Sequence, residues 1–152
     1  MKRILVGLDA SPRAPEVVET ASRLAHALGG EVVLYRAVGI PTEIPHEAYA
    51  LSPEGVTQLL VSQAKAYLEG CMPMLSGLQV RARVDVGTSW RSICAAAHEE
   101  HADLIIIGSH GFGGLDRVMG TTAAKVVNHA ECSVLVVREH KSPVIPAADD
   151  AD

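Results

Sequence analysis

Short apolar segments alternate along the chain with longer segments in which apolar residues recur at helical spacing. The apolar segments are 4–7, 32–35, 80–86, 104–107 and 134–137. Runs such as Leu104-Ile105-Ile106-Ile107 have no polar alternation, which is typical of parallel strands covered by helices on both faces. The pattern therefore predicts an α/β fold: a three-layer sandwich with a five-stranded parallel sheet between helices.

Segment 80–86 differs from the others because its residues alternate. Val80, Ala82, Val84 and Val86 would share one face, and charged residues the other. Alternation of this kind indicates an edge strand with one solvated face. Right-handed crossovers, together with helices on both faces, require one reversal of direction along the sheet. The predicted strand order is 3-2-1-4-5.

Most helical segments begin at residues that resemble N-caps. Ser11-Pro12 and Ser52-Pro53 each pair a capping serine with a proline at the first helical position. Pro73 should end or kink the second helix. The predicted caps of the last two helices are Thr88 or Ser89, and Thr121 or Thr122.

The composition predicts one soluble domain. The chain has 152 residues, of which 48% are hydrophobic and 20% charged. We expect the domain to span residues 1–138, followed by a flexible acidic tail over 139–152. Residues 39–51 contain two prolines and little periodicity. They predict a loop long enough to serve as a flap or another functional segment.

Several classes of protein do not fit the sequence. The formal net charge is −5, no basic run occurs and aromatic residues make up only 3%, so we expect no nucleic-acid partner. No apolar stretch approaches the ~20 residues of a membrane span, and Asp9 interrupts any signal-peptide core. We therefore expect a cytoplasmic protein without a membrane partner. The three cysteines and seven histidines lack metal-ligand spacing, so we expect free thiols and no metal site.

Two unusual loops should meet where strands one and four end. In open α/β sheets, ligands bind at the carboxyl ends of strands where the direction of winding reverses. The loop after strand one contains Asp9, and four glycines fall within residues 108–114 after strand four. Gly120-Thr121-Thr122 follows at a helix start. Glycine amides, threonine hydroxyls and a helix N-terminus suit phosphate, whereas Asp9 suits a ribose.

Plainer interpretations stay open for both loops. The glycines could form an ordinary turn, and Asp9 could be a helix-start acid favoured by the dipole. Nucleotide motifs of other types are absent: the sequence has no GxxxxGK[ST], no GxGxxG after the first strand and no GxSxG. We identify no catalytic residue, since His110 has no visible carboxylate to orient it.

The glycine pattern resembles that of the universal stress protein family. The resemblance rests on Gly108-x-x-Gly111 followed by Gly120-Thr121, on the opening strand that ends at Asp9, and on the closing segment 133–138. It implies an ATP-binding regulatory protein that acts in the stress response as a nucleotide-sensing homodimer. The ligand would be ATP, with or without Mg²⁺, or AMP. The dimer would form through Val134, Leu135, Val136 and Val137.

The resemblance also implies roles for individual residues. Gly7 and Asp9 would contact the adenosine, with Asp9 on the ribose or base. The backbone of Ala37 would lie against adenine, and Ile107 and Gly108 would line the base and ribose. The residues that would hold phosphate are Gly111, Gly120, Thr121 and Thr122.

The sequence departs from the family pattern at two places. Eight residues separate Gly111 from Gly120, one fewer than is usual, and Arg36-Ala37 stands where many members have His-Val. A nucleotide-free dimeric interaction module and a slow ATP-hydrolysing enzyme therefore remain alternatives.

Overall fold

The computed structural model describes residues 3–39, 52–109 and 119–138, and contains a five-stranded parallel sheet. The strands are β1 (Arg3–Gly7), β2 (Glu31–Val38), β3 (Val80–Val86), β4 (Leu104–Gly108) and β5 (Ser133–Val137). The helices are α1 (Ala14–Leu28), α2 (Pro53–Cys71), the 3₁₀ helix η2 (Met72–Leu75), α3 (Ser89–Glu99) and α4 (Thr121–His129). The strand order is β3-β2-β1-β4-β5, which confirms the predicted fold and order. Residues 40–51 of the predicted loop 39–51, and the predicted tail at 139–152, lie outside the described residues.

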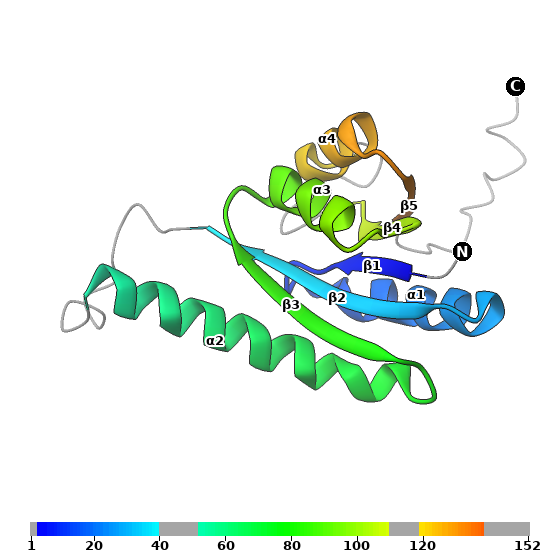
Figure 1. The fold of residues 1–152 in the computed structure, drawn as a ribbon, viewed down its shortest axis with the longest axis horizontal. Coiled ribbons are helices and arrows are strands. Elements are labelled where there is room, and N and C mark those ends of the chain that lie inside the picture. Colours follow the sequence, from blue (N-terminus) through cyan, green and yellow to red (C-terminus); the bar gives the residue numbers. More distant parts are fainter. Residues whose placement is uncertain (1–2, 40–51, 110–118, 139–152) are drawn as a thin grey trace, which may run out of the picture.

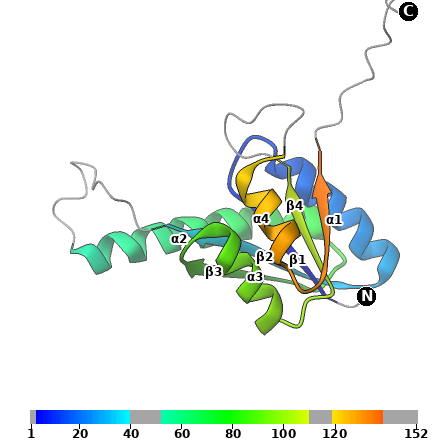
Figure 2. The ribbon, with the colours of Figure 1, turned by 90° about the horizontal axis from the view of Figure 1, so that it is seen from above.

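The helices form one layer on each face of the sheet. α1 and α2 pack on one face, and α3 and α4 on the other (Figure 1). Seen from above, α3 and α4 lie over the sheet (Figure 2). Each face has its own aliphatic cluster: Ile4, Val18 and Leu68 belong to the first, and Ile93, Ile105 and Val126 to the second. Both faces of the central strands are therefore buried, which explains their continuous apolar runs.

The register aligns the ends of three strands. Gly7 of β1 lies opposite Tyr35 of β2 and Ile107 of β4. Gly108 lies opposite Val137 of β5. The loops that leave β1 and β4 therefore start side by side, as the strand order required.

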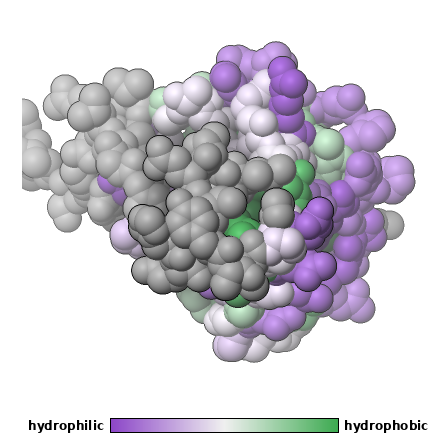
Figure 3. All heavy atoms as spheres, turned by 90° about the vertical axis from the view of Figure 1, so that its left-hand side faces the viewer, coloured by the Kyte–Doolittle hydropathy of each residue, from purple (hydrophilic) through white to green (hydrophobic). Residues whose placement is uncertain are grey.

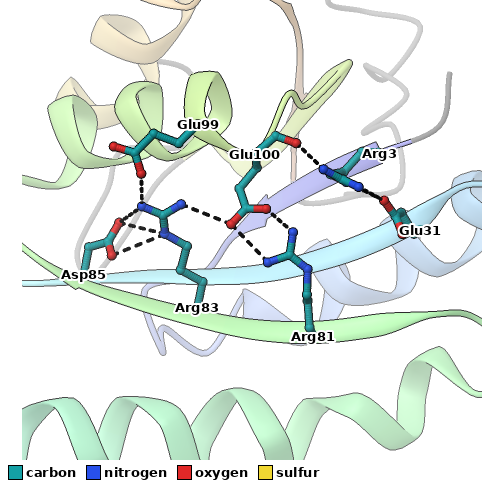
Figure 4. Close-up of polar contacts among 7 residues, drawn as sticks. All are labelled: Arg3, Glu31, Arg81, Arg83, Asp85, Glu99 and Glu100. Carbon is teal, nitrogen blue, oxygen red and sulfur yellow. Dashed lines mark hydrogen bonds and ion pairs between the residues drawn. The ribbon is translucent and has the colours of Figure 1, made fainter.

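The charged face of β3 is covered by ion pairs rather than by water alone. Arg83 bonds to Asp85, Glu99 and Glu100, and Arg81 pairs with Glu100 (Figure 4). Hydrogen bonds from Arg81, together with those from Arg83, lower the pKa of Glu100 to about 2 despite its partial burial. This network fastens the end of α3 to the edge strand.

Arg3 extends the network to the centre of the sheet. Its guanidinium donates to the Glu100 carbonyl oxygen at 2.5 Å and pairs with the Glu31 carboxylate (Figure 4). The backbone amide of Arg3 also donates to Asp103 Oδ2 at 3.0 Å. β1, β2 and the α3–β4 connection are thus tied at the amino ends of the strands.

Two of the predicted helix caps are wrong. α1 begins at Ala14 with Arg13 as its N-cap residue, because Ser11 is buried and its carbonyl accepts the Ala14 amide in a turn. α4 begins at Thr121 itself, after Gly120. Ser52 is confirmed as a cap, since its hydroxyl accepts the Gly55 amide at 3.1 Å. Thr88 is the N-cap residue of α3, and α2 gives way to η2 at Met72, just before Pro73.

Among the described residues, no helix combines the length and apolar character needed to cross a membrane.

Candidate functional site

A pocket of about 350 Å³ opens at the carboxyl ends of β1, β2 and β4. Eight of the predicted site residues line it: Gly7, Asp9, Ala37, Ile107, Gly108, Gly120, Thr121 and Thr122. Gly111, the ninth, lies outside the described residues. Figure 3 looks onto this end of the molecule, where a small apolar area is visible next to hydrophilic side chains. The structure thus brings together segments that are about a hundred residues apart in sequence.

The β1–α1 loop is held by its own aspartate. Asp9 Oδ1 accepts a hydrogen bond from the Ser11 amide at 2.9 Å. The Leu8 amide donates to the Tyr35 carbonyl at 2.9 Å, which extends the contact with β2 beyond the strand. Ala10 has a φ of 59°, the left-handed region that non-glycine residues rarely occupy. The loop therefore turns sharply at Ala10, and its strained residue directly follows the pocket aspartate.

The β4–α4 connection is closed at its base. The Gly120 amide donates to the Ser109 carbonyl at 2.7 Å, and the Ser109 amide donates to the Val137 carbonyl at 2.9 Å. Ser109 is buried, whereas Thr121 and Thr122 are exposed at the start of α4. Gly120, the N-cap residue of α4, has no side chain that could cap the helix. The backbone amides of the first turn and the hydroxyls of Thr121 and Thr122 therefore lie together at the positive end of the helix dipole.

The floor of the pocket is apolar. A Cβ atom at Gly7 would lie 3.0 Å from Ile107 Cγ2 and 3.5 Å from Ile93 Cδ1. The absence of a side chain at Gly7 therefore preserves space above these two isoleucines. An apolar floor with polar groups at one side suits a ligand with an apolar ring and an anionic end.

Tyr35 supports the floor from β2. Its ring is fully buried, and its hydroxyl donates to Asp85 Oδ2 at 3.1 Å. Burial, reinforced by the neighbouring Asp85 carboxylate, raises the pKa of Tyr35 well above its usual range. The hydroxyl therefore stays protonated and acts as a structural donor.

Several pocket residues were not predicted from the sequence. They include Ser11, Arg13, Tyr35, Arg36, Ser89 and Ser109. Ser89 lines the pocket because the first turn of α3 points toward it, as the first turn of α4 does. Arg13 and Arg36 are the charged residues that join Asp9 in the described lining. A sequence signal existed for Arg36, since it interrupts the apolar character of β2 next to Ala37.

A second, smaller cavity of about 240 Å³ lies at the far end of α3. It is lined in part by Cys94, His98, His101, Glu131 and Cys132. His98 Nδ1 and Glu131 Oε2 are 2.8 Å apart, and all three cysteines are free and partly buried. Burial raises the pKa of both Cys94 and Cys132. Within the ranges that the structure covers, no group of three or more potential ligands is arranged to hold a metal ion.

Comparison with known proteins identifies similar sequences. The chain matches the Universal stress protein family over residues 1–138. Universal stress protein A homolog 2 of Coxiella burnetii is 30% identical over 138 residues, covering 90% of this chain and 94% of that protein.

Solved structures share the fold. UspA from Lactobacillus plantarum superposes with a TM-score of 0.76 at 22% identity, covering 90% of this chain and 97% of its own. A universal stress protein in complex with cAMP gives 0.67 at 23% identity, with coverage of 93% and 98%. A universal stress protein from Archaeoglobus fulgidus in complex with dAMP gives 0.60 at 20% identity, with coverage of 91% and 98%.

Proposed function

The chain belongs to the universal stress protein family, and on that premise we propose that it binds an adenine nucleotide, ATP in particular, as a regulatory ligand. The observation that carries the proposal is the pocket of about 350 Å³ where β1 and β4 end. It combines an apolar floor, a carboxylate and a helix N-terminus within one opening, which are the features a nucleotide requires.

Each part of the nucleotide has a suitable partner in this pocket. Adenine would lie over Gly7 and Ile107, against the backbone of Ala37. Asp9 and Gly108 would take the ribose, and the free oxygen of the Asp9 carboxylate could accept a hydroxyl while the other holds Ser11. Phosphate would meet the first turn of α4.

Phosphate binding at α4 would depend mainly on Thr121 and Thr122. The Gly120 amide already donates to the Ser109 carbonyl. Gly120 would therefore contribute chiefly because it has no side chain, which lets a phosphate group come close to the backbone. Gly111 would add a further amide if the family pattern holds. The threonine hydroxyls and first-turn amides would donate to phosphate oxygens, as at other helix N-termini.

Two similar proteins support a nucleotide as the ligand class. One universal stress protein of this fold is in complex with cAMP, and another with dAMP. Both ligands share an adenine ring and one phosphate group. We propose ATP for this chain, with AMP as the nearest alternative, and Mg²⁺ would accompany ATP through its phosphates.

The proposed role is regulation in a stress response, with ATP as a signal. The charged residues of the described lining are Asp9, Arg13 and Arg36, and no lysine accompanies them. Since this described lining contains neither a lysine nor a histidine, we expect any hydrolysis of ATP to be slow. A cytoplasmic location stays a prediction from the sequence.

We also propose a homodimer through β5. β5 is an edge strand of the sheet, and Val134 to Val137 are only partly buried in the single chain. An apolar edge strand of this kind needs a cover, and a second copy would supply it. Sedimentation equilibrium should give a dimer that Val134→Lys weakens, and a monomer at all concentrations would refute this part.

Titration calorimetry of the full chain with Mg-ATP tests the main proposal. Saturable binding with one site per chain is expected, and GTP should bind more weakly. Absence of heat at millimolar ATP, AMP and cAMP would refute it. Asp9→Ala should weaken ATP binding, whereas Glu19→Ala, on the exposed face of α1, serves as a matched control.

The second candidate is a nucleotide-free interaction module of the same fold. It is favoured by the shorter spacing between Gly111 and Gly120 and by the use of the Gly120 amide within the protein. Chromatography of the supernatant from denatured, freshly purified protein separates the two. Stoichiometric adenine nucleotide would exclude the second candidate.

A further inference from the structure

The pocket contains two cations to which the contacts proposed above assign no role. Within the part of the chain that the structure describes, Arg13 and Arg36 line it together with Asp9. The whole chain, by contrast, carries a formal net charge of −5. Cationic side chains that line a pocket of an acidic protein favour the binding of an anionic group there.

Both arginines belong to the α1–α2 side of the sheet. Side chains alternate along β2: Tyr35 is buried in the cluster with α3 and α4, whereas the guanidinium of Arg36 lies 5.5 Å from the centre of the Tyr67 ring of α2. Arg13 is the N-cap residue of α1. Thr121 and Thr122 begin α4, on the opposite side of the sheet. The pocket therefore has two separate regions suited to anions.

Arg36 is well prepared to bind phosphate. Stacking on Tyr67 restricts its long side chain and leaves the edge of the guanidinium available for hydrogen bonds. The planar fork matches two phosphate oxygens at once. Because the side chain is already ordered, less conformational entropy is lost when an anion binds.

Asp9 lines the same pocket as both regions, together with Arg13 and Arg36 on one side and Thr121 and Thr122 on the other. If Asp9 accepts a ribose hydroxyl, Arg36 and Arg13, which line the same pocket, would be the cations available to a phosphate on the 2′ or 3′ oxygen. In other nucleotide folds an acidic residue holds the ribose hydroxyl, and a nearby arginine accommodates a phosphate on that oxygen.

We propose that Arg13 and Arg36 form a second anion subsite, and that the preferred ligand is an adenine nucleotide with a phosphate on the 2′ or 3′ oxygen as well as at the 5′ position. The inference rests on the proposed function, since it assumes that adenosine occupies the pocket. The two arginines would neutralise the ribose phosphate beside Asp9, and the start of α4 would hold the 5′ phosphate.

The test compares three ligands that differ only in ribose phosphate. Adenosine 3′,5′-bisphosphate, adenosine 2′,5′-bisphosphate and AMP are titrated into the full chain by calorimetry at low and high salt. At least one bisphosphate should bind roughly tenfold more tightly than AMP, and the isomer that does so identifies the oxygen. Its advantage should shrink at high salt, because the added contacts are ionic.

Variants assign the preference to the arginines. Arg36→Gln and Arg13→Gln should each reduce the ratio of bisphosphate to AMP affinity, and the double variant should bring it close to one. Arg23→Gln, which removes an exposed arginine elsewhere on α1, should keep the wild-type ratio. Arg36→Lys preserves the charge without the planar fork and should give an intermediate ratio, even if Arg36→Gln folds poorly.

The outcomes separate this inference from the proposed function. If AMP binds as tightly as both bisphosphates, or if the preference survives in the double variant, the second subsite is refuted while nucleotide binding stands. If neither ATP, AMP nor either bisphosphate binds, both proposals fail together.

Discussion

The carbonyl of Ser109 and the amide of Gly120 are joined by a hydrogen bond of 2.7 Å across the base of the glycine-rich connection. Ser109 directly follows β4 and Gly120 directly precedes α4, so the bond fixes where the helix begins relative to the sheet. The shorter spacing between Gly111 and Gly120 therefore does not prevent α4 from reaching the pocket. Its positive end faces the same opening as Asp9, which is the relationship on which the proposed function depends.

Loss of a threonine hydroxyl at α4 should weaken nucleotide binding through the phosphates. Thr121→Val and Thr122→Val should each lower ATP affinity by roughly tenfold, the usual effect of removing a hydrogen bond to a charged group. Calorimetry with ATP and with adenosine measures this. Thr121→Ser retains a hydroxyl and is the matched control. An equal loss for adenosine would show that the threonines do not act on phosphate.

Asp9 should serve two separable purposes. Asp9→Asn keeps an oxygen that can accept the Ser11 amide but removes the charge, so stability should change little while nucleotide affinity falls. Asp9→Ala also removes the 2.9 Å hydrogen bond and should cost about 1 kcal/mol of unfolding free energy. Urea unfolding and calorimetry distinguish these effects. Full affinity in Asp9→Asn would mean that the carboxylate charge is not used.

The strain at Ala10 should be relieved by glycine. Ala10 has a φ of 59° and His101, at the end of α3, has a φ of 53°. Ala10→Gly and His101→Gly should each raise the unfolding free energy by roughly 0.5–1 kcal/mol, since glycine adopts this conformation without a Cβ clash. Only Ala10→Gly should also alter nucleotide affinity, because His101 is outside the pocket. Destabilisation of both variants would contradict the strain argument.

The ion pairs of Glu100 should make stability depend on acid pH. The folded pKa is lowered to about 2 from an ordinary value of 4.5, so the stabilisation is complete above the unfolded pKa and is lost as the pH falls toward 2. Glu100→Gln should lower the unfolding free energy at pH 7 by about 1–2 kcal/mol, a figure reduced for the exposure of Arg81. The difference from wild type should vanish at low pH. Urea unfolding across this range measures it, with Glu19→Gln as the control; a constant difference would refute the linkage.

The sheet could be predicted from the sequence because strands that are buried on both faces have continuous apolar sequences. The all-apolar runs at β1 and β4 and the alternation at β3 were sufficient to order the strands. The apolar run 32–35 covers only part of β2, because Arg36 is a charged residue whose backbone still pairs with β3 through Val84. The start of α1 was misplaced because Ser11 and Pro12 form a turn before the helix, a local competition that residue types alone do not resolve.

The candidate site could be predicted as far as backbone and topology determine it. Asp9 follows from where parallel strands end, Thr121 follows from the helix start after the glycines, and Gly7 was implied only by the family resemblance. Arg13 was not assigned to the pocket because the start of α1 was misplaced, and Arg36, although it interrupts the apolar run of β2, was not assigned because its contact with Tyr67 of α2 is not visible in the sequence. The ion pairs of Arg83 with Glu99 and Glu100 could not be predicted either, because these two glutamates come from the far end of α3.

The central claim is that ATP binds where β1 and β4 end, and backbone amide NMR of the labelled full chain tests its location most directly. On addition of Mg-ATP, the account predicts saturable shifts at Gly7, Ala37, Gly108, Thr121 and Thr122. Amides around the second cavity, such as those of His98 and Cys132, should stay in place. Shifts confined to the second cavity, or no shifts at millimolar ATP, would contradict it.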